Sequence, residues 1–274
     1  KASPNPLKVK IDQKNNIPLK KIESLEIPLI LPKNYLLAGT KKGLYYWDFQ
    51  NPPFLIKQKG KVKKILKTER GFYFLTYQGI FFTSNLRDFE EKNTGLTKKV
   101  IKHYRNNIKT FSEEIQDLKD LKIDPKNQNN LVTATKDGVF YSTNGGNSWE
   151  FLKNPTTTTG ITSVLIYSNP HLEILFAHPF RGVYHKNISQ NTPWKELNFG
   201  LKRSSGMYEE VSDLSLRVNA EGQLEILALH NFYPQILKLN TKIQKWEVLY
   251  ETDKKFEVAQ GLFIKENQAL FTTN

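Results

Sequence analysis

The sequence predicts an all-β protein built from short antiparallel strands that repeat along the chain. Three observations support this prediction. β-branched and aromatic residues gather in short runs bounded by Gly, Asn, Asp and Pro. One three-strand pattern recurs four times. The 274 residues are 38% hydrophobic and 12% aromatic, which is enough to fill one large β domain or two small ones.

The clearest element spans residues 131–152, LVTATKDGVFYSTNGGNSWEFL. LVTAT, GVFYS and SWEFL are each typical of a strand, and LKDLKIDP before them supplies a fourth. Asp137-Gly138 forms a two-residue corner, and TNGGN is a tight turn whose glycines accept a positive φ angle. The segment therefore predicts a four-stranded antiparallel sheet.

The third strand of this sheet begins with Gly, an aliphatic residue and an aromatic residue, and this triplet repeats. The copies begin at Gly43, Gly79, Gly138 and Gly182, at intervals of 36, 59 and 44 residues. Each copy follows an apolar run and precedes an aromatic-led strand, starting at Phe54, Phe89, Trp149 and Trp194. A degenerate fifth copy has Trp246 in the same place. We expect Trp149, Trp194 and Trp246 to occupy equivalent positions in successive sheets.

Repeats of roughly 40–50 residues indicate a β-propeller of four-stranded blades. We expect a single domain, residues 1–274, with six blades. Their approximate limits are 22–59, 60–96, 117–153, 160–200, 209–251, and 256–274 joined by 1–21. In the last blade, strands from both chain ends would close the ring and cover two open sheet edges. The alternative is a fragment of a larger propeller.

Residues 97–116 form an insertion between the second and third blades. Thr110 and Glu113 make a weak capping-box pair, which allows a short helix near residues 110–118. For the insertion as a whole we favour a solvated basic loop over an arm that binds a partner.

One turn of the repeat resembles a known family. The segment Ser142-Thr143-Asn144-Gly145-Gly146-Asn147-Ser148-Trp149 is similar to the Asp-box (BNR, sortilin-like) repeat, S-x-D-x-G-x-x-W, with Asn144 in place of Asp. The resemblance implies a structural role for Ser142, Asn144, Gly146 and Trp149: the polar side chain caps the turn and the indole packs beneath it. It also implies a propeller that holds another protein. The alternative is one Gly-rich hairpin in an unrelated β protein.

Charge and composition limit the partners. The net charge is +13, but it comes mostly from Lys spread along the chain, whereas sites that read phosphates or carboxylates bidentately use Arg. We therefore do not expect nucleic-acid binding, and binding of an anionic polymer or surface is our third choice. There are no cysteines, and no apolar run approaches the ~18 residues of a membrane span. No signal peptide is visible, but KASPNP resembles the start of a mature or trimmed chain, so this absence says little about the compartment. We expect an exported protein of the periplasm, the cell envelope or the medium.

Candidate partner-binding residues lie in the loops between the second and third strands, which we call the loop face. In four-stranded blades these loops share one side with the blade-to-blade connections, and propellers usually bind there. The candidates, including three from the insertion, are Lys41, Lys42, Tyr77, His103, Tyr104, Arg105, Lys136, His178, Phe180, Arg181, His230, Phe232 and Tyr233.

No catalytic pattern accompanies these residues. A resemblance to sialidases would imply three Arg that hold a carboxylate, a Tyr activated by a Glu, and an Asp that acts as acid and base. In this chain Tyr208 and Glu209 are adjacent in sequence, and adjacent side chains on an extended segment point in opposite directions. The five histidines lack metal-ligand spacing, and no phosphate loop is present. We therefore expect a non-catalytic scaffold for a protein or peptide, with no cofactor and no metal. The alternative is a glycan-binding protein or a sialidase-like glycoside hydrolase.

Overall fold

The structure, a computed structural model, is built from β-strands alone in the part of the chain that it describes. That part comprises residues 22–26, 35–48, 51–57, 60–105, 108–156, 160–219, 221–231, 235–251, 259–265 and 268–273. No helix of the described ranges is long and apolar enough to span a membrane. The expectation of an all-β fold is confirmed.

The described strands include five four-stranded antiparallel sheets, in each of which the strands pair in chain order. The first holds β1 (Ile22–Glu26), β2 (Leu36–Thr40), β3 (Gly43–Trp47) and β4 (Phe54–Lys57). The second holds β5 (Val62–Lys67), β6 (Phe72–Thr76), β7 (Gly79–Thr83) and β8 (Glu90–Glu91). The third holds β11 (Leu121–Ile123), β12 (Leu131–Ala134), β13 (Gly138–Ser142) and β14 (Glu150–Lys153). The fourth holds β15 (Ser163–Ser168), β16 (Leu172–His178), β17 (Gly182–Asn187) and β18 (Lys195–Glu196). The fifth holds β21 (Val211–Val218), β22 (Leu224–His230), β23 (Gln235–Asn240) and β24 (Lys245–Glu251).

Three two-stranded sheets complete the described fold. They are β9 (Thr97–Arg105) with β10 (Ile108–Ile115), β19 (Arg203–Ser204) with β20 (Met207–Tyr208), and β25 (Ala259–Lys265) with β26 (Gln268–Thr273). In the described ranges, β25 and β26 pair only with each other. The N-terminal segment assigned above to ring closure, residues 1–21, lies outside the described residues.

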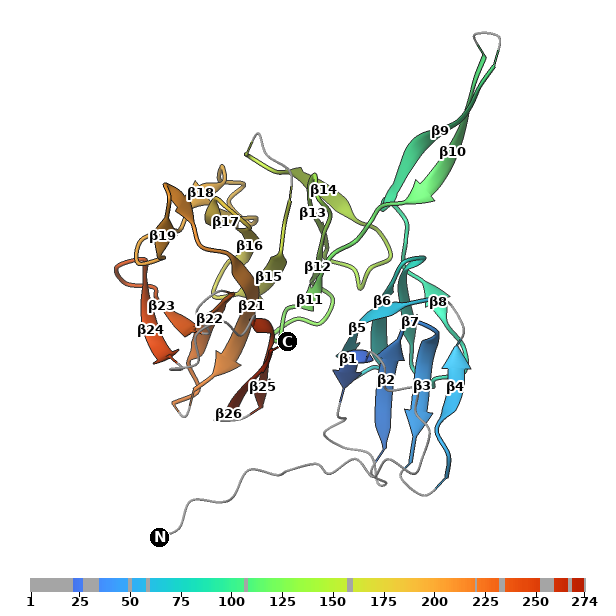
Figure 1. Ribbon diagram of the computed structural model, residues 1–274, viewed down its shortest axis with the longest axis horizontal. Coiled ribbons are helices and arrows are strands. Elements are labelled where there is room, and N and C mark those ends of the chain that lie inside the picture. The colour runs from blue at the N-terminus through green and yellow to red at the C-terminus, as the bar shows by residue number, and fades with distance from the viewer. Residues whose placement is uncertain are drawn as a thin grey trace.

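The first strands of the sheets, which we call the inner strands, lie side by side in chain order. β1 neighbours β5, β5 neighbours β11, and the succession continues through β15 and β21 to β25 (Figure 1). Several inner strands share one irregularity. Near the start of β1, β5, β21 and β25 two residues lie opposite one residue of the second strand, as in a β-bulge.

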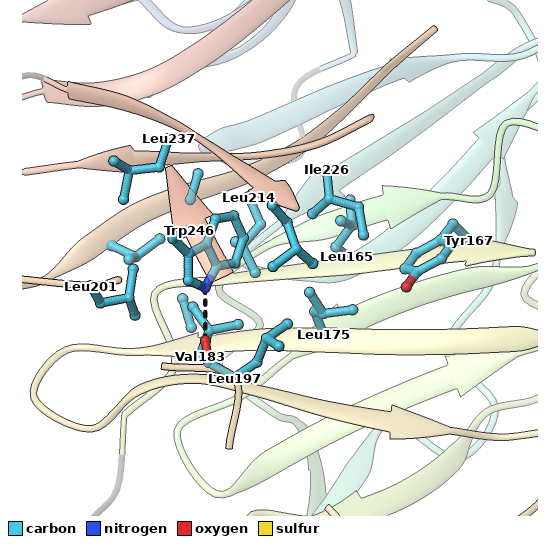
Figure 2. Packing of buried hydrophobic residues seen from close by; sticks show 14 residues of the cluster. Leu165, Tyr167, Leu175, Val183, Leu197, Leu201, Leu214, Ile226, Leu237 and Trp246 are labelled. Carbon is cyan, nitrogen blue, oxygen red and sulfur yellow. Dashed lines mark hydrogen bonds between the residues drawn. The ribbon is translucent and has the colours of Figure 1, made fainter. Parts of the chain in front are cut away.

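Each hydrophobic core lies between two consecutive sheets. The second strands β2 and β6 are buried at every position, so both faces of these strands are covered. Four clusters fill the spaces between the first and second, second and third, third and fourth, and fourth and fifth sheets. Figure 2 shows the last of these, in which Leu214 and Ile226 of the fifth sheet meet Leu165 and Leu175 of the fourth.

The three expected tryptophans make the same hydrogen bond. The indole N–H of Trp149 donates to the carbonyl of Lys92 at 2.8 Å, that of Trp194 to Lys153 at 3.1 Å, and that of Trp246 to Leu197 at 2.7 Å (the last in Figure 2). Each acceptor lies at the end of the fourth strand of the preceding sheet, or directly after it. The expectation that these indoles are equivalent is confirmed. Each bond joins one sheet to the next.

A connector of sequence Asn-x-Gly-Leu, which the sequence analysis missed, stands beside two of these bonds. Asn93 Oδ1 accepts from the N–H of Ile80 at 2.8 Å, and Asn198 Oδ1 accepts from the N–H of Val183 at 2.7 Å. The following glycine, Gly200 in the second copy, has φ +90° and lies against the backbone of Trp246. Only glycine combines that backbone conformation with so close an approach.

The insertion corrects one expectation. Residues 97–115 form neither a short helix near 110–118 nor a loop but the hairpin β9–β10, which projects from the body of the protein (Figure 1). Cross-strand pairing decides the structure: Phe111 lies opposite Ile101, Glu113 opposite Lys99 and Glu114 opposite Lys98. These pairs stabilise strands more than the weak cap at Thr110 stabilises a helix.

We expect Gly200→Ala to destabilise the protein strongly. An added Cβ would lie 2.2 Å from the carbonyl oxygen of Trp246, in addition to the strain of a positive φ. The matched control is Gly222→Ala, where φ is +78° and nothing lies within 4 Å, so that only the conformational cost of about 1–2 kcal/mol applies. Urea denaturation measures both variants. An equal loss of stability in the two would show that the close sheet-to-sheet contact is unimportant.

Candidate functional site

The turns of the loop face are closed by one repeated side chain. In the first three sheets it is a threonine, whose hydroxyl donates to the carbonyl of the glycine three residues on: Thr40 to Gly43, Thr76 to Gly79 and Thr135 to Gly138, at 3.0, 3.0 and 3.2 Å. The turns are therefore rigid, and the residues between these two positions project outward.

Most of the candidate residues in these turns are exposed. Lys41, Lys42, Lys136 and Arg181 are exposed, and Tyr77 and Phe180 have 58% and 55% of their surface accessible. The ammonium group of Lys63 lies 4.1 Å from the centre of the Tyr77 ring. This part of the loop face is thus basic and aromatic, as the sequence indicates.

Two candidate histidines are in the interior instead. His178 and His230 are 1% and 0% exposed. Both end the second strand of their sheets, as Thr40 and Thr76 do in the first two sheets, and Thr135 directly follows the second strand of the third. His178 Nδ1 accepts the N–H of Phe180 at 3.2 Å, and so closes its turn as threonine does elsewhere. Neither imidazole can meet a partner on the surface.

The other candidates are not placed on the loop face. His103, Tyr104 and Arg105 belong to strand β9 of the projecting hairpin, and the positions of their side chains lie outside what the structure describes. Phe232 and Tyr233 also lie outside the described residues.

The structure adds a short hairpin that the sequence analysis missed. Strands β19 and β20 lie in the connection between the fourth and fifth sheets, and the N–H of Tyr208 donates to the carbonyl of Phe180 at 3.3 Å. Met207 is 50% exposed and Arg203 stacks on the Tyr208 ring at 4.8 Å. The hairpin therefore extends the aromatic surface at Phe180. The sequence signal for this hairpin is the segment Ser-Ser-Gly-Met-Tyr at residues 204–208, where a glycine-containing turn precedes two large apolar side chains.

A set of charged residues joins four inner strands. This inner-strand network consists of Lys64, Asp120, Lys122, Ser163 and Asp213. Asp120 pairs with Lys64, and Lys122 Nζ lies 2.8 Å from Asp213 Oδ1. The hydroxyl of Ser163 lies between the two carboxylates, 2.8 Å from Asp120 Oδ2 and 2.9 Å from Asp213 Oδ1. All members stand near the start of their strands, at the end where the loop face begins.

Burial and neighbouring charge act against each other in this network. Burial alone would raise the pKa of Asp120, but Lys64 and Lys122 lower that pKa to about 2. Burial would lower the pKa of Lys122, but Asp213 and Asp120 outweigh burial and raise it above its usual value. For Lys64, burial prevails over Asp120 and lowers the pKa. The network holds its charges by mutual pairing, so its carboxylates have structural partners.

Tyrosine–carboxylate pairs exist, but their electrostatics oppose nucleophilic chemistry. The hydroxyl of Tyr141 donates to Glu150 at 2.6 Å, and that of Tyr167 donates to Glu173 at 2.5 Å. Burial and the neighbouring carboxylate raise the pKa of Tyr141 to about 12. The pKa of Tyr167 is raised by the same causes. A nucleophilic tyrosine requires the opposite shift.

The turn at residues 142–149 has the bonds expected of a capped turn. Asn144 Oδ1 accepts the N–H of Ser148 at 3.0 Å, and Ser142 Oγ accepts the N–H of Gly146 at 2.9 Å. Trp149 is buried in the cluster between the second and third sheets. The N–H of Gly145 also donates to the carbonyl of Asn129 at 2.9 Å. The turn is therefore tied to its own sheet and to the preceding loop.

Beside this turn lies a polar hollow of about 300 Å³, lined by Glu69, Arg70 and residues 125–129. Its wall is organised by bonds between neighbouring loops. Arg70 Nη2 donates to Asn129 Oδ1 at 2.8 Å, and Gln128 Oε1 accepts the N–H of Glu69 at 2.9 Å. The hollow lies between first-to-second strand loops, at the end of the strands opposite the loop face.

No family model matches the chain, and no curated protein matches its sequence. Solved structures do match. The extracellular domain of a one-component system from B. thetaiotaomicron is 12% identical, with a TM-score of 0.59 over 92% of this chain and 31% of that one. YCF48 bound to a D1 peptide is 11% identical, with a TM-score of 0.50 over 87% of this chain and 71% of that one. The WD40 β-propeller domain of Doa1 is 7% identical, with a TM-score of 0.56 over 91% and 74%. The chain spans less than a third of the first of these proteins, and the likeness shows a fold of the β-propeller type.

We expect Asp120→Asn to reduce stability most at neutral pH. The folded-state pKa of Asp120 is lowered to about 2, below the unfolded-state value of 3.8. The charged carboxylate therefore stabilises the folded protein fully above about pH 4. This stabilisation is lost as the pH falls from about 4 to about 2. The expected loss at pH 7 is on the order of 2 kcal/mol or more, because two lysines lose a buried partner.

The matched control is Asp117→Asn. Asp117 likewise pairs with a lysine, Lys63, but its side chain is half exposed. That pair should contribute at most about 1 kcal/mol. Urea denaturation between pH 2 and pH 7 measures both variants. A gap between wild type and Asp120→Asn that stays constant over this range would contradict the assignment of the charge.

Proposed function

We propose that the chain is a non-catalytic propeller scaffold that binds a protein or peptide partner through its loop face. One observation carries the proposal: Tyr77 and Phe180 are more than half exposed on closed turns of the loop face, and turns of the same face present the exposed Lys41, Lys42 and Arg181. Exposed aromatic side chains on fixed backbone give contact area at little entropic cost, and basic neighbours favour an acidic or carboxylate-bearing segment.

The interior supports a binding role over a catalytic one. The lysines and carboxylates at the start of the inner strands pair with one another, so their charges are committed to the fold. Tyr141, Tyr167 and Tyr184, which donate hydrogen bonds to glutamates, all have raised pKa values. The exposed side chains of the loop face are mainly aromatic and basic. Such side chains are suited to binding another protein.

The structural likenesses support the same class of function and a setting outside the cytoplasm. YCF48, which has the same type of fold, was solved with a bound peptide. The B. thetaiotaomicron protein contributes an extracellular domain. We propose by analogy that this chain is exported and holds a segment of another protein. The capped turn at Asn144 and the buried Trp149 support membership of the Asp-box group.

We further propose a six-bladed ring. Five four-stranded sheets stand in sequence, and the pair β25–β26 lies beside β21, where a sixth would begin. Two strands from residues 1–21 would complete that blade. This completion would cover an open sheet edge, which otherwise promotes self-association.

Glycan binding is the second candidate. The hollow beside Arg70 favours it, because amide, carboxylate and guanidinium groups line a space of about 300 Å³. Such groups donate and accept hydrogen bonds in the pattern that sugar hydroxyls offer.

We expect the double variant Tyr77→Ala/Phe180→Ala to lose partner binding without losing stability. Peptides selected with the wild-type chain from a random phage-displayed library should bind the variant at least roughly tenfold more weakly, as for anchor side chains. The control is Ile243→Ala, which removes a 56% exposed side chain in the turn between β23 and β24. Unchanged peptide binding by the double variant would exclude the loop face. Binding of the wild type to a panel of immobilised glycans would favour the second candidate.

We expect removal of residues 1–21 to destabilise the protein and promote self-association. If these residues complete the blade begun by β25 and β26, their loss exposes a sheet edge. Thermal melting and light scattering measure the two effects, and removal of the projecting part of the hairpin, residues 99–113, is the control for shortening the chain. A truncated protein that melts like the full chain and stays monomeric would rule out this closure.

A further inference from the structure

Five buried polar atoms without a hydrogen-bond partner belong to residues at one end of the fifth sheet, just before β21, at the end of β22 and at the start of β23. They are Glu209 Oε2, both ring nitrogens of His230, Asn231 Oδ1 and Gln235 Oε1. A buried polar atom without a partner costs about 1–3 kcal/mol. Several such atoms close together in the chain require a physical explanation, and buried water and a bound ion are two of those available.

The backbone brings these side chains together. His230 ends β22 and Gln235 begins β23, and the pairing of Leu229 with Ile236 makes His230 and Gln235 the next facing pair. Their side chains therefore leave the sheet on the same face. They are 0% and 1% exposed. The N–H of Asn231 donates to the carbonyl of Glu210 at 3.0 Å, which holds the strand leading to Glu209 alongside.

The fold does not explain the unused imidazole. At the equivalent position Thr40, Thr76 and Thr135 close their turns, and His178 does so through Nδ1. His230 is the member of this set whose side chain makes no such bond. The buried imidazole of His230 therefore does not close its turn, as the four equivalent side chains do.

The distance between two of the atoms discriminates among possible occupants. His230 Nδ1 and Glu209 Oε2 are 3.3 Å apart, and neither atom takes part in a hydrogen bond. Two ligands at about 2.1 Å from one metal ion would be 3.3 Å apart at an angle of about 104°, close to tetrahedral. A water or an ammonium group at about 2.9 Å from both would need an angle of about 70°, which is too acute for two of its hydrogen bonds.

We propose that His230, Glu209 and Gln235 bind a divalent first-row transition metal ion of the Mn²⁺ to Zn²⁺ series. Imidazole nitrogen with carboxylate and amide oxygen is a donor set of this class, and Asn231 Oδ1 stands next to it as a further oxygen. The described residues hold no group of three His, Cys, Asp or Glu side chains suited to a metal, so the amide oxygen of Gln235 completes the set.

A neighbouring carboxylate orients the amide of Gln235. Glu251 accepts a hydrogen bond from Gln235 Nε2 at 2.6 Å, and Glu251 lies 3.8 Å from Lys202. That bond leaves Gln235 Oε1 free to point away from Glu251.

The test is calorimetric titration of the full chain, freed of metal by chelator, with Zn²⁺ and with Mn²⁺. We expect one ion per chain and a higher melting temperature with at least one of these metals. His230→Thr, which installs the residue found at this position in the first three sheets, should weaken binding roughly 100-fold or more, because even outer-shell changes cost 10–100-fold. Glu209→Gln should do the same while keeping the shape of the side chain.

The matched control is His178→Thr, the same exchange at the equivalent position of the fourth sheet, which should leave affinity and stoichiometry unchanged. Circular dichroism verifies the fold of each variant. Failure of both metals to bind the wild type, or equal binding by His230→Thr and Glu209→Gln, would overturn the proposal and assign the orphaned atoms to buried water. Peptide selection on the metal-free chain is independent of this result, so failure here leaves the proposed scaffold role intact.

Discussion

Burial on both faces of the second strands is the constraint on which the rest of this structure depends. β2 and β6 have no exposed position, so a sheet built on them cannot be stable alone in water. Each sheet must be covered by the next, which explains why the cores lie between sheets and not within them. The indole bonds of Trp149 and Trp246 then fix the distance and orientation between neighbours.

Much of the repeat could be predicted because its signals are local. The glycine triplets at 43, 79, 138 and 182 each begin a third strand, since glycine is required where the turn meets the strand. The hairpin at residues 97–115 could not be predicted from the cap at Thr110. Its strands are set by pairing with residues on the other side of the turn, and a capping pattern carries no information about such partners.

The candidate site divides in the same way. The exposure of Tyr77 and Phe180 follows from their place in two short turns, and the sequence indicates it correctly. The burial of His178 and His230 follows from their equivalence to threonines in other sheets, which becomes visible only when the registers are aligned in space. The inner-strand network could not be foreseen, because Lys122 and Asp213 are 91 residues apart in the chain.

That separation has a consequence for how the chain folds. The hairpins within each sheet join residues close in sequence and can form early, since closing a short loop costs little entropy. The bonds from Ser163 to Asp120 and Asp213 span 43 and 50 residues and require the third, fourth and fifth sheets to be in place together. The network therefore forms late in folding, and it stabilises only a chain whose sheets are in the correct order. An arrangement with one sheet out of order would leave charged side chains buried and unpaired, so the same ion pairs that stabilise the finished protein select against misassembled intermediates.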